Sequence, residues 1–191
     1  MFNSFLKNCV TGEFSSKIKE ACHMSSGTTS VSLSVFATNP TDGKLVAILQ
    51  QRGPWDHEQQ KSQSFAGCYQ LAVHGKTETP REAVLREAHE ELGLAFAELT
   101  AQTDVAVING VAVTAAEQVL HFLTLVPFDW LSQIELHKSA SRYVLITVDE
   151  VDDLQPINPK LHRSGVDPNG ARFMFQDEIN ALREGFARLS S

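Results

Sequence analysis

The most regular pattern near the start of the chain is an alternation of apolar and polar residues over positions 30–37. The odd positions hold valine, leucine, valine and alanine, and serine occupies positions 30, 32 and 34. This period of two is typical of a strand with one buried face. Turn residues at 39–43 and an apolar run at 44–49 predict a second strand that pairs with the first as a hairpin.

Later segments predict further strands and two helices. Helical spacing of apolar residues predicts helices over residues 79–94 and 171–189. A bulge or turn is expected at Asn109-Gly110, and a long polar loop over residues 50–64. Strands before, between and after two helices predict an α/β or α+β domain with a mixed sheet. The further strands are expected over residues 65–73, 105–113, 118–128 and 143–148, the last followed by an acidic turn at 149–150.

Residues 1–29 lack a firm periodicity and end in a run of Ser, Gly and Thr. We expect them to form a loosely attached N-terminal extension that can include a short helix around residues 14–23. The folded domain is therefore predicted to span residues 30–191.

Net charge narrows the classes of partner. The 191 residues include 16 Lys plus Arg and 23 Asp plus Glu, which gives a formal charge of −7. Non-specific binding to a nucleic-acid backbone relies on clustered Lys and Arg, so the acidic balance argues against it. An anionic substrate is still compatible with this charge, because a bound cation reverses the local field.

The cysteine content and the hydropathy of the sequence indicate the cellular compartment. Cys9, Cys22 and Cys68 are an odd set without a C-x-x-C pair, which favours a reducing, cytoplasmic environment over a disulfide framework. No signal-peptide pattern is found, and no run approaches the ~18 apolar residues of a membrane helix. We therefore expect no membrane partner.

The predicted helix over residues 79–94 carries the candidate chemistry, and its ends are well specified. Thr79 suits the N-cap, Pro80 suits the first helical position, and Glu82 completes a capping box with Thr79. Gly93 suits a left-handed residue that closes the helix.

Three carboxylates lie side by side on this helix. At about 100° per residue, Glu87, Glu90 and Glu91 fall within an arc of roughly 100°. Like charges this close repel, but a hard divalent cation such as Mg²⁺ or Mn²⁺ prefers such oxygen ligands and often shares them with substrate phosphates. Arg86 is placed to hold Glu90 or Glu78 in position. The neighbouring face is apolar and comprises Val84, Leu85, Ala88 and Leu92.

An isolated E-x-x-E-E would be explained best as a solvated helix face, but here it is part of a longer motif. The string R-E-A-H-E-E-L-G-L over residues 86–94 fits the core of the Nudix signature, R-E-U-x-E-E-x-G-U, where U is aliphatic. Glu78 lies at the upstream spacing of that signature, and the chain closely resembles the Nudix hydrolase family. An ungapped alignment puts Ala72 in place of the first glycine of the signature. A gapped alignment uses Gly75 instead and shortens the loop before the helix by about three residues.

The resemblance implies an α/β/α sandwich and Mg²⁺-dependent hydrolysis of a diphosphate linkage, usually in a nucleoside diphosphate joined to another group. It implies Glu87, Glu90 and Glu91 as metal ligands, with Glu78 as a further one. Glu87 or Glu90 is implied instead as a base that acts through water, and Arg86 as an orienting residue. In several relatives an acid from a later loop completes the site. The candidates for it here, each more typical of an ordinary surface residue, are Glu117, Glu135 and Glu150.

Substrate contacts are expected outside the motif. Trp55, Phe65 and Tyr69 are candidates for stacking on a base, although core packing is the favoured interpretation of Phe65 and Tyr69. His121 lies in a strand-like run and is interpreted as a core or edge histidine, because no ligand partners stand at a defined spacing from it.

The leading prediction is a Mg²⁺-dependent hydrolase that cleaves a diphosphate linkage in a small nucleotide or nucleotide conjugate, and three alternatives stay open. One is removal of a cap or a diphosphate from an RNA 5′ end, which the resemblance permits and the negative charge disfavours. Another is a Nudix-fold binding or regulatory module without turnover, which Ala72 motivates. An isomerase acting on a prenyl diphosphate ranks last, because no suitable acid and cysteine pair is identified.

Overall fold

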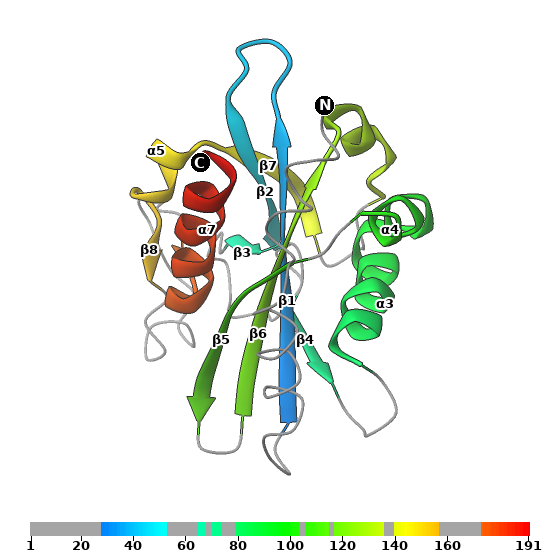
Figure 1. Cartoon of the computed structure of the whole chain (residues 1–191), viewed down its shortest axis with the longest axis vertical. Coiled ribbons are helices and arrows are strands. Elements are labelled where there is room, and N and C mark those ends of the chain that lie inside the picture. Colours follow the sequence, from blue (N-terminus) through cyan, green and yellow to red (C-terminus); the bar gives the residue numbers. More distant parts are fainter. Residues whose placement is uncertain are drawn as a thin grey trace.

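A mixed β-sheet with helices on both faces forms the centre of the protein (Figure 1). The computed structural model describes residues 28–52, 65–67, 70–73, 79–103, 106–114, 117–135, 140–156 and 173–191. The sheet has seven strands, which are β1 (Thr28–Thr38), β2 (Leu45–Arg52), β3 (Phe65–Gly67), β4 (Gln70–Val73), β5 (Ala106–Thr114), β6 (Glu117–Val126) and β7 (Ala140–Ile146).

The remaining described elements are short strands and helices. Two short strands pair in parallel, namely β8 (Gln155–Pro156) and β9 (Phe173–Met174). The helices are α3 (Pro80–Leu92), α4 (Leu94–Ala101), the 3₁₀ helix η2 (Phe128–Gln133), α5 (Val148–Val151) and α7 (Gln176–Leu189).

Strand β1 is the centre of the sheet. It runs parallel to β6 on one side, and β6 continues to β5 in antiparallel fashion. On its other side β1 pairs with two strands in turn, with β4 at residues 29–32 and with β2 at residues 35–38. The sheet is therefore mixed, and β4 and β2 pair with different parts of the same edge of β1.

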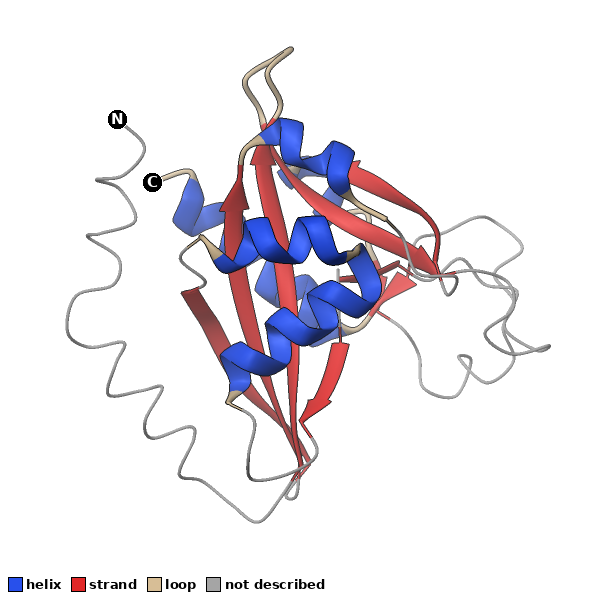
Figure 2. Cartoon of the chain, turned by 90° about the vertical axis from the view of Figure 1, so that its right-hand side faces the viewer, coloured by secondary structure: helices blue, strands red, loops and turns tan. Residues whose placement is uncertain are grey.

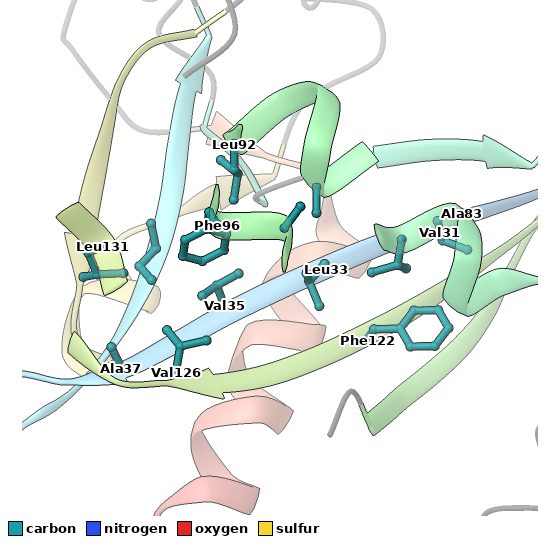
Figure 3. Packing of buried hydrophobic residues seen from close by; sticks show 14 of the residues in the cluster. Val31, Leu33, Val35, Ala37, Ala83, Leu92, Phe96, Phe122, Val126 and Leu131 are labelled. Atoms are coloured by element: carbon teal, nitrogen blue, oxygen red, sulfur yellow. The ribbon is translucent and has the colours of Figure 1, made fainter. Parts of the chain in front are cut away.

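The alternation in β1 separates two cores. Its residues Val31, Leu33 and Val35 are fully buried beneath α3 and α4, as Figure 3 shows. Phe36 points to the opposite face and packs beneath α7. Burial of each such side chain stabilises the fold by ~1.5–3 kcal/mol. Figure 2 shows α3 and α4 lying across the first face, so the predicted α/β/α sandwich is confirmed.

Helix α7 approaches β1 closely because of a glycine. A Cβ atom added to Gly185 would lie 2.4 Å from Cζ of Phe36, which is far inside van der Waals contact. The ring of Phe36 meets that of Phe186 edge to face, with centroids 5.1 Å apart. Gly185 thus sets the distance between the helix and the sheet.

Several boundaries differ from those that the sequence predicts. Residues 65–73 form two strands rather than one, because β3 pairs with β2 and β4 pairs with β1. The last helix begins at Gln176, and Phe173 lies in β9 instead. The acidic pair at 149–150 belongs to α5, whose Thr147 and Glu150 form a capping box. Helices α4 and η2 were not expected from the sequence pattern.

The expected bulge near Asn109 is present. The register between β5 and β6 shifts between Val107 and Asn109, where β5 carries one extra residue. Strand β1 begins at Thr28, two residues before the strand that the sequence predicts. Residues 1–27, with the short helix expected around residues 14–23, lie outside the described residues. Every helix in the described ranges is too short or too polar to cross a membrane.

Candidate active site

The N-terminus of α3 is fixed by the capping box that the sequence predicts. The Glu82 backbone N–H donates to Oγ1 of Thr79 at 3.3 Å, and the Thr79 N–H donates to the Glu82 carboxylate at 2.7 Å. The Thr79 hydroxyl also donates to the Glu82 carboxylate at 2.7 Å, and the two Thr79 donors lower the pKa of Glu82, the backbone N–H having the larger effect. Pro80 occupies the first turn as expected. The start of the helix is therefore set by local chemistry.

The C-terminus of α3 is set by Gly93 and by a segment distant in sequence. Gly93 has φ +90° and ψ 157°, so its φ is positive as expected but its ψ is not left-handed helical, and α4 follows at once. The Glu135 N–H donates to the Leu92 carbonyl at 2.9 Å. A Cβ on Gly93 would lie 2.8 Å from Cβ of Glu135. Glycine is therefore required both for the backbone turn and for this close approach.

The side chains of α3 are graded from buried to exposed around the helix. Its apolar stripe faces the sheet and consists of Ala83, Val84, Ala88 and Leu92, all buried. Glu87 lies next to that stripe with 15% of its side chain exposed, whereas Glu90 is 55% exposed. Glu91 is half-buried. The three carboxylates thus form a band along the margin of the packed face, as the helical spacing predicts.

Arg86 pairs with two of these carboxylates. Its Nη1 donates to Oε1 of Glu87 at 2.5 Å and to Oε1 of Glu90 at 3.3 Å. The sequence predicts contact with Glu90 or Glu78; the structure has the contact with Glu90 and adds one with Glu87, and Glu78 lies outside the described residues. One guanidinium group therefore orients both carboxylates and offsets part of their mutual repulsion.

The carboxylates of Glu87, Glu90 and Glu91 are chemically suited to bind a hard cation. All three side chains offer carboxylate oxygens, which are the ligands that Mg²⁺ and Mn²⁺ prefer. Within the described ranges, however, no three His, Cys, Asp or Glu side chains gather tightly enough to hold an ion. Glu78, the fourth predicted ligand, lies outside those ranges. The metal roles of Glu87, Glu90 and Glu91 therefore stay predictions.

The other predicted residues fall in several places. Trp55 and Tyr69, like Glu78, lie outside the described residues, and Phe65 begins β3 opposite Gln51. Ala72 lies in β4 opposite Ser30. A residue in an antiparallel ladder has an extended backbone that any amino acid adopts, so alanine causes no strain there.

The three candidates for a later acid have different surroundings. Glu150 accepts the Thr147 N–H at 2.8 Å and serves as part of the capping box of α5. Glu117 is the first residue of β6. Glu135 lies against Gly93 at the end of α3. Glu135 therefore contacts the end of the carboxylate-bearing helix.

One polar pair could not be found from local sequence. Nε2 of His121, in β6, lies 3.2 Å from Oδ2 of Asp177, in α7, and the two residues are 56 positions apart. His121 is 1% exposed, in agreement with its interpretation as a core histidine. No sequence motif links the two positions.

Comparison with known proteins supports the fold. No protein-family model matches the sequence, and neither does any curated protein. A MutT/Nudix family protein from Listeria innocua is 15% identical, with a TM-score of 0.57 over 88% of this chain and 96% of that protein. The C. elegans Ap4A hydrolase in a binary complex is 12% identical, with a TM-score of 0.50 over 85% of this chain and 98% of that one. The chain has the Nudix fold, as the resemblance implies.

Proposed function

We propose that the protein is a Mg²⁺-dependent hydrolase of the Nudix type, which cleaves a diphosphate linkage in a nucleotide or in a nucleoside diphosphate joined to another group. The observation that supports this most strongly is the band of Glu87, Glu90 and Glu91 on α3, in the order of the Nudix signature and within a Nudix fold. The proposed function is supported by the motif and the fold together, and neither would be sufficient without the other.

The position of two of the glutamates along α3 strengthens it. Glu90 and Glu91 lie in the last turn, where the carbonyl ends of the peptide groups make negative charge unfavourable. A charge misplaced in this way costs ~0.3–1 kcal/mol at an exposed site. Arg86 offsets only part of this. A function that needs the carboxylates there accounts for an arrangement that folding alone disfavours.

The roles proposed for the residues follow from their types. Glu87, Glu90, Glu91 and Glu78 would hold Mg²⁺ or Mn²⁺, and Arg86 would keep Glu87 and Glu90 aligned. The bound cation would neutralise phosphate oxygens and lower the pKa of a water that attacks phosphorus. Glu87 or Glu90 would otherwise accept the proton of that water.

The proposed substrate is a small nucleotide conjugate. Support comes from the formal charge of −7, which disfavours a long phosphate backbone, and from the fold shared with a protein described as an Ap4A hydrolase. Trp55, Phe65 and Tyr69 stay candidates for stacking on the base. We further propose that the protein works in the cytoplasm, on the basis of its cysteine use.

A product-resolved screen tests the proposal. The purified full-length protein is incubated with Mg²⁺ and with nucleotide sugars, dinucleotides, nucleoside triphosphates and capped RNA. We expect release of a nucleoside monophosphate from at least one small conjugate, loss of that release in Glu91→Gln, and retention in Glu98→Gln, which alters an exposed glutamate of α4.

Other results would redirect the assignment. Full activity in Glu91→Gln would contradict the role of that glutamate. Cleavage confined to capped RNA would favour the RNA 5′-end hydrolase, and metal-dependent binding without any product would favour a binding module.

A further inference from the structure

A buried amide side chain lies on the sheet face that α3 and α4 cover. Gln50 follows Val46 and Ile48 at alternate positions of β2, and those two residues belong to the apolar cluster beneath α3 and α4. Gln50 is 5% exposed, and its Oε1 has no hydrogen-bond partner among the described residues. A buried acceptor without a partner is unfavourable unless a ligand supplies a donor.

A second buried polar residue on the same face shows what a structural role requires. Thr124 of β6 lies between Phe122 and Val126 in the alternation, and both of these belong to the same apolar cluster. Thr124 is fully buried, and its Oγ1 lies 2.8 Å from Oγ1 of Thr103. The fold therefore supplies a partner for this hydroxyl. It supplies none among the described residues for Oε1 of the buried amide, so packing alone does not explain a glutamine at that position.

An exposed aromatic residue stands next to the buried amide. Tyr143 of β7 lies directly opposite Gln50 in an antiparallel pair, so the two side chains share a face and their Cβ atoms are ~4.5–5.5 Å apart. Tyr143 is 36% exposed. Solvent therefore reaches the sheet face at the position beside the amide.

The amide also lies at the split between β4 and β2. Strand β2 separates from β1 after the pair of Val35 with Ile48, and β4 pairs with β1 only as far as Ser32. Continuing the β1–β2 register by two residues places Gln50 level with Leu33, where β1 pairs with neither strand.

This level of the sheet corresponds to the middle of α3. Figure 3 shows Ala83, near the start of α3, beside Val31, and Leu92, at its end, on the side of Val35. Glu87 lies about midway between Ala83 and Leu92 along the helix. The amide and the glutamate-bearing helix therefore occupy the same face of the sheet at the same level.

We propose that Tyr143 and Gln50 bind the base of a nucleotide substrate, Tyr143 by stacking its ring on the base and Gln50 by accepting a hydrogen bond at Oε1 from an N–H group. Rotation of the exposed Tyr143 side chain would give the base access to Oε1, a kind of change that is common at binding surfaces. Stacking tolerates any base, so the ring would supply affinity and the amide the preference among bases. The choice of ligand rests on the proposed function, which places the diphosphate of the substrate at the α3 glutamates.

Isothermal titration calorimetry tests this directly. The full-length protein is titrated in Mg²⁺ with AMP, GMP, CMP, UMP and ribose 5-phosphate, none of which has a diphosphate linkage to cleave. We expect at least one nucleotide to bind at least about tenfold more tightly than ribose 5-phosphate. Equal binding of ribose 5-phosphate, or no binding of any nucleotide, would overturn the proposal.

Variants of Tyr143 test the stacking. Tyr143→Ala should weaken binding of the preferred nucleotide by about tenfold or more, whereas Tyr143→Phe, which keeps the ring, should bind within about twofold of the wild type. Val148→Ala is the matched control, because it also shortens an exposed apolar side chain, at the start of α5. Wild-type affinity in Tyr143→Ala would refute the stacking role.

A variant of Gln50 separates recognition from structure. Gln50→Met keeps the length of the side chain and removes the acceptor, so nucleotide binding should weaken by about tenfold. Its urea unfolding midpoint should stay the same or rise, because a buried acceptor without a partner has been removed. Gln176→Met, at the exposed start of α7, should change neither value. Unchanged affinity in Gln50→Met, or a large loss of stability, would refute the role of Gln50.

The outcome can be distinguished from failure of the proposed hydrolase. If no substrate is cleaved but nucleotide binding depends on Tyr143 and Gln50, the inference stands and the hydrolase proposal falls. If hydrolysis occurs with the same KM and the same base preference in Tyr143→Ala and Gln50→Met, the hydrolase proposal stands and the inference falls.

Discussion

Helices α3 and α7 cover opposite faces of one sheet, and both carry acidic residues in the first turn, but α3 carries two more in its last turn. In α7, Asp177 lies in the first turn, where the exposed N–H groups stabilise negative charge. In α3, Glu90 and Glu91 lie in the last turn, where the same helix dipole disfavours them. The comparison separates acids that assist folding from acids that folding tolerates, and the second kind points to function.

The two helices also differ in the size of the side chains that they bury. Helix α7 buries large side chains, including Ile179, Leu182 and Phe186, and approaches the sheet closely at Gly185. Half of the buried residues of helix α3 are alanines, Ala83 and Ala88. Helix α7 therefore has more buried apolar surface to stabilise it, while α3 combines a modest packed face with a margin of carboxylates.

The largest expected effect concerns activity at α3. Glu87→Gln should lower Mg²⁺-dependent hydrolysis at least about a hundredfold, because loss of residues that only support metal ligands already costs 10–100-fold. The free energy of unfolding without Mg²⁺ should fall by only about 1 kcal/mol, because Glu87 is 15% exposed and its ion pair with Arg86 is weakened. Steady-state kinetics and urea unfolding give the two values. A large loss of stability with retained activity would reverse the assignment of α3.

The next effect concerns packing at α7. Gly185→Ala should destabilise the protein by ~1–3 kcal/mol, because its Cβ would overlap the buried ring of Phe36. Alanine also favours the helix over glycine by ~1 kcal/mol, which opposes the destabilisation. This gain is smaller than the upper end of the cost of overlap. Urea unfolding measures the change, and Asn180→Ala on the exposed side of α7 is the control. A stabilised Gly185→Ala protein would show that the helix can move away from the sheet.

A smaller effect is expected at the start of α3. Thr79→Ala removes the side-chain half of the capping box and should cost ~0.5–2 kcal/mol of unfolding free energy. Thr41→Ala, in the exposed turn between β1 and β2, should change little. Equal stability of the two variants would show that packing rather than capping fixes this end of α3.

The smallest effect is a pH dependence at α7. The hydrogen bond to His121 lowers the pKa of Asp177 in the folded protein, so its contribution is present above the unfolded value of about 3.9. That contribution is lost as the pH falls through the lower, folded-state pKa. Asp177→Asn should therefore destabilise the protein more at pH 7 than below pH 3, in urea unfolding at both values. Asp152→Asn, whose carboxylate is exposed, is the comparison, and an equal loss at both pH values would contradict the pairing.

Local chemistry made α3 predictable from sequence. Thr79, Pro80 and Glu82 specify its start, and the period of its glutamates and apolar residues specifies its faces, so the structure agrees with the sequence on both. The Nudix fold was likewise implied by the resemblance that the motif carries, and the order of strands and helices is compatible with it. These features depend on residues within a few positions of one another.

Non-local contacts were not predictable in the same way. The approach of Glu135 to Gly93 and the pair of His121 with Asp177 join segments that are far apart in sequence. The start of α7 was misplaced for a related reason. Phe173 fits a helical period on paper, but pairing of β9 with β8 holds it in a strand.

Unfolding in the presence of Mg²⁺ tests most directly whether the α3 glutamates bind a cation. A ligand that binds the folded state alone stabilises it, by about 2.7 kcal/mol at a hundred times its Kd. We expect Mg²⁺ to raise the unfolding free energy of the wild type and of Glu98→Gln, and to leave that of Glu91→Gln unchanged. An equal rise in all three proteins, or none in any, would contradict a cation site on α3.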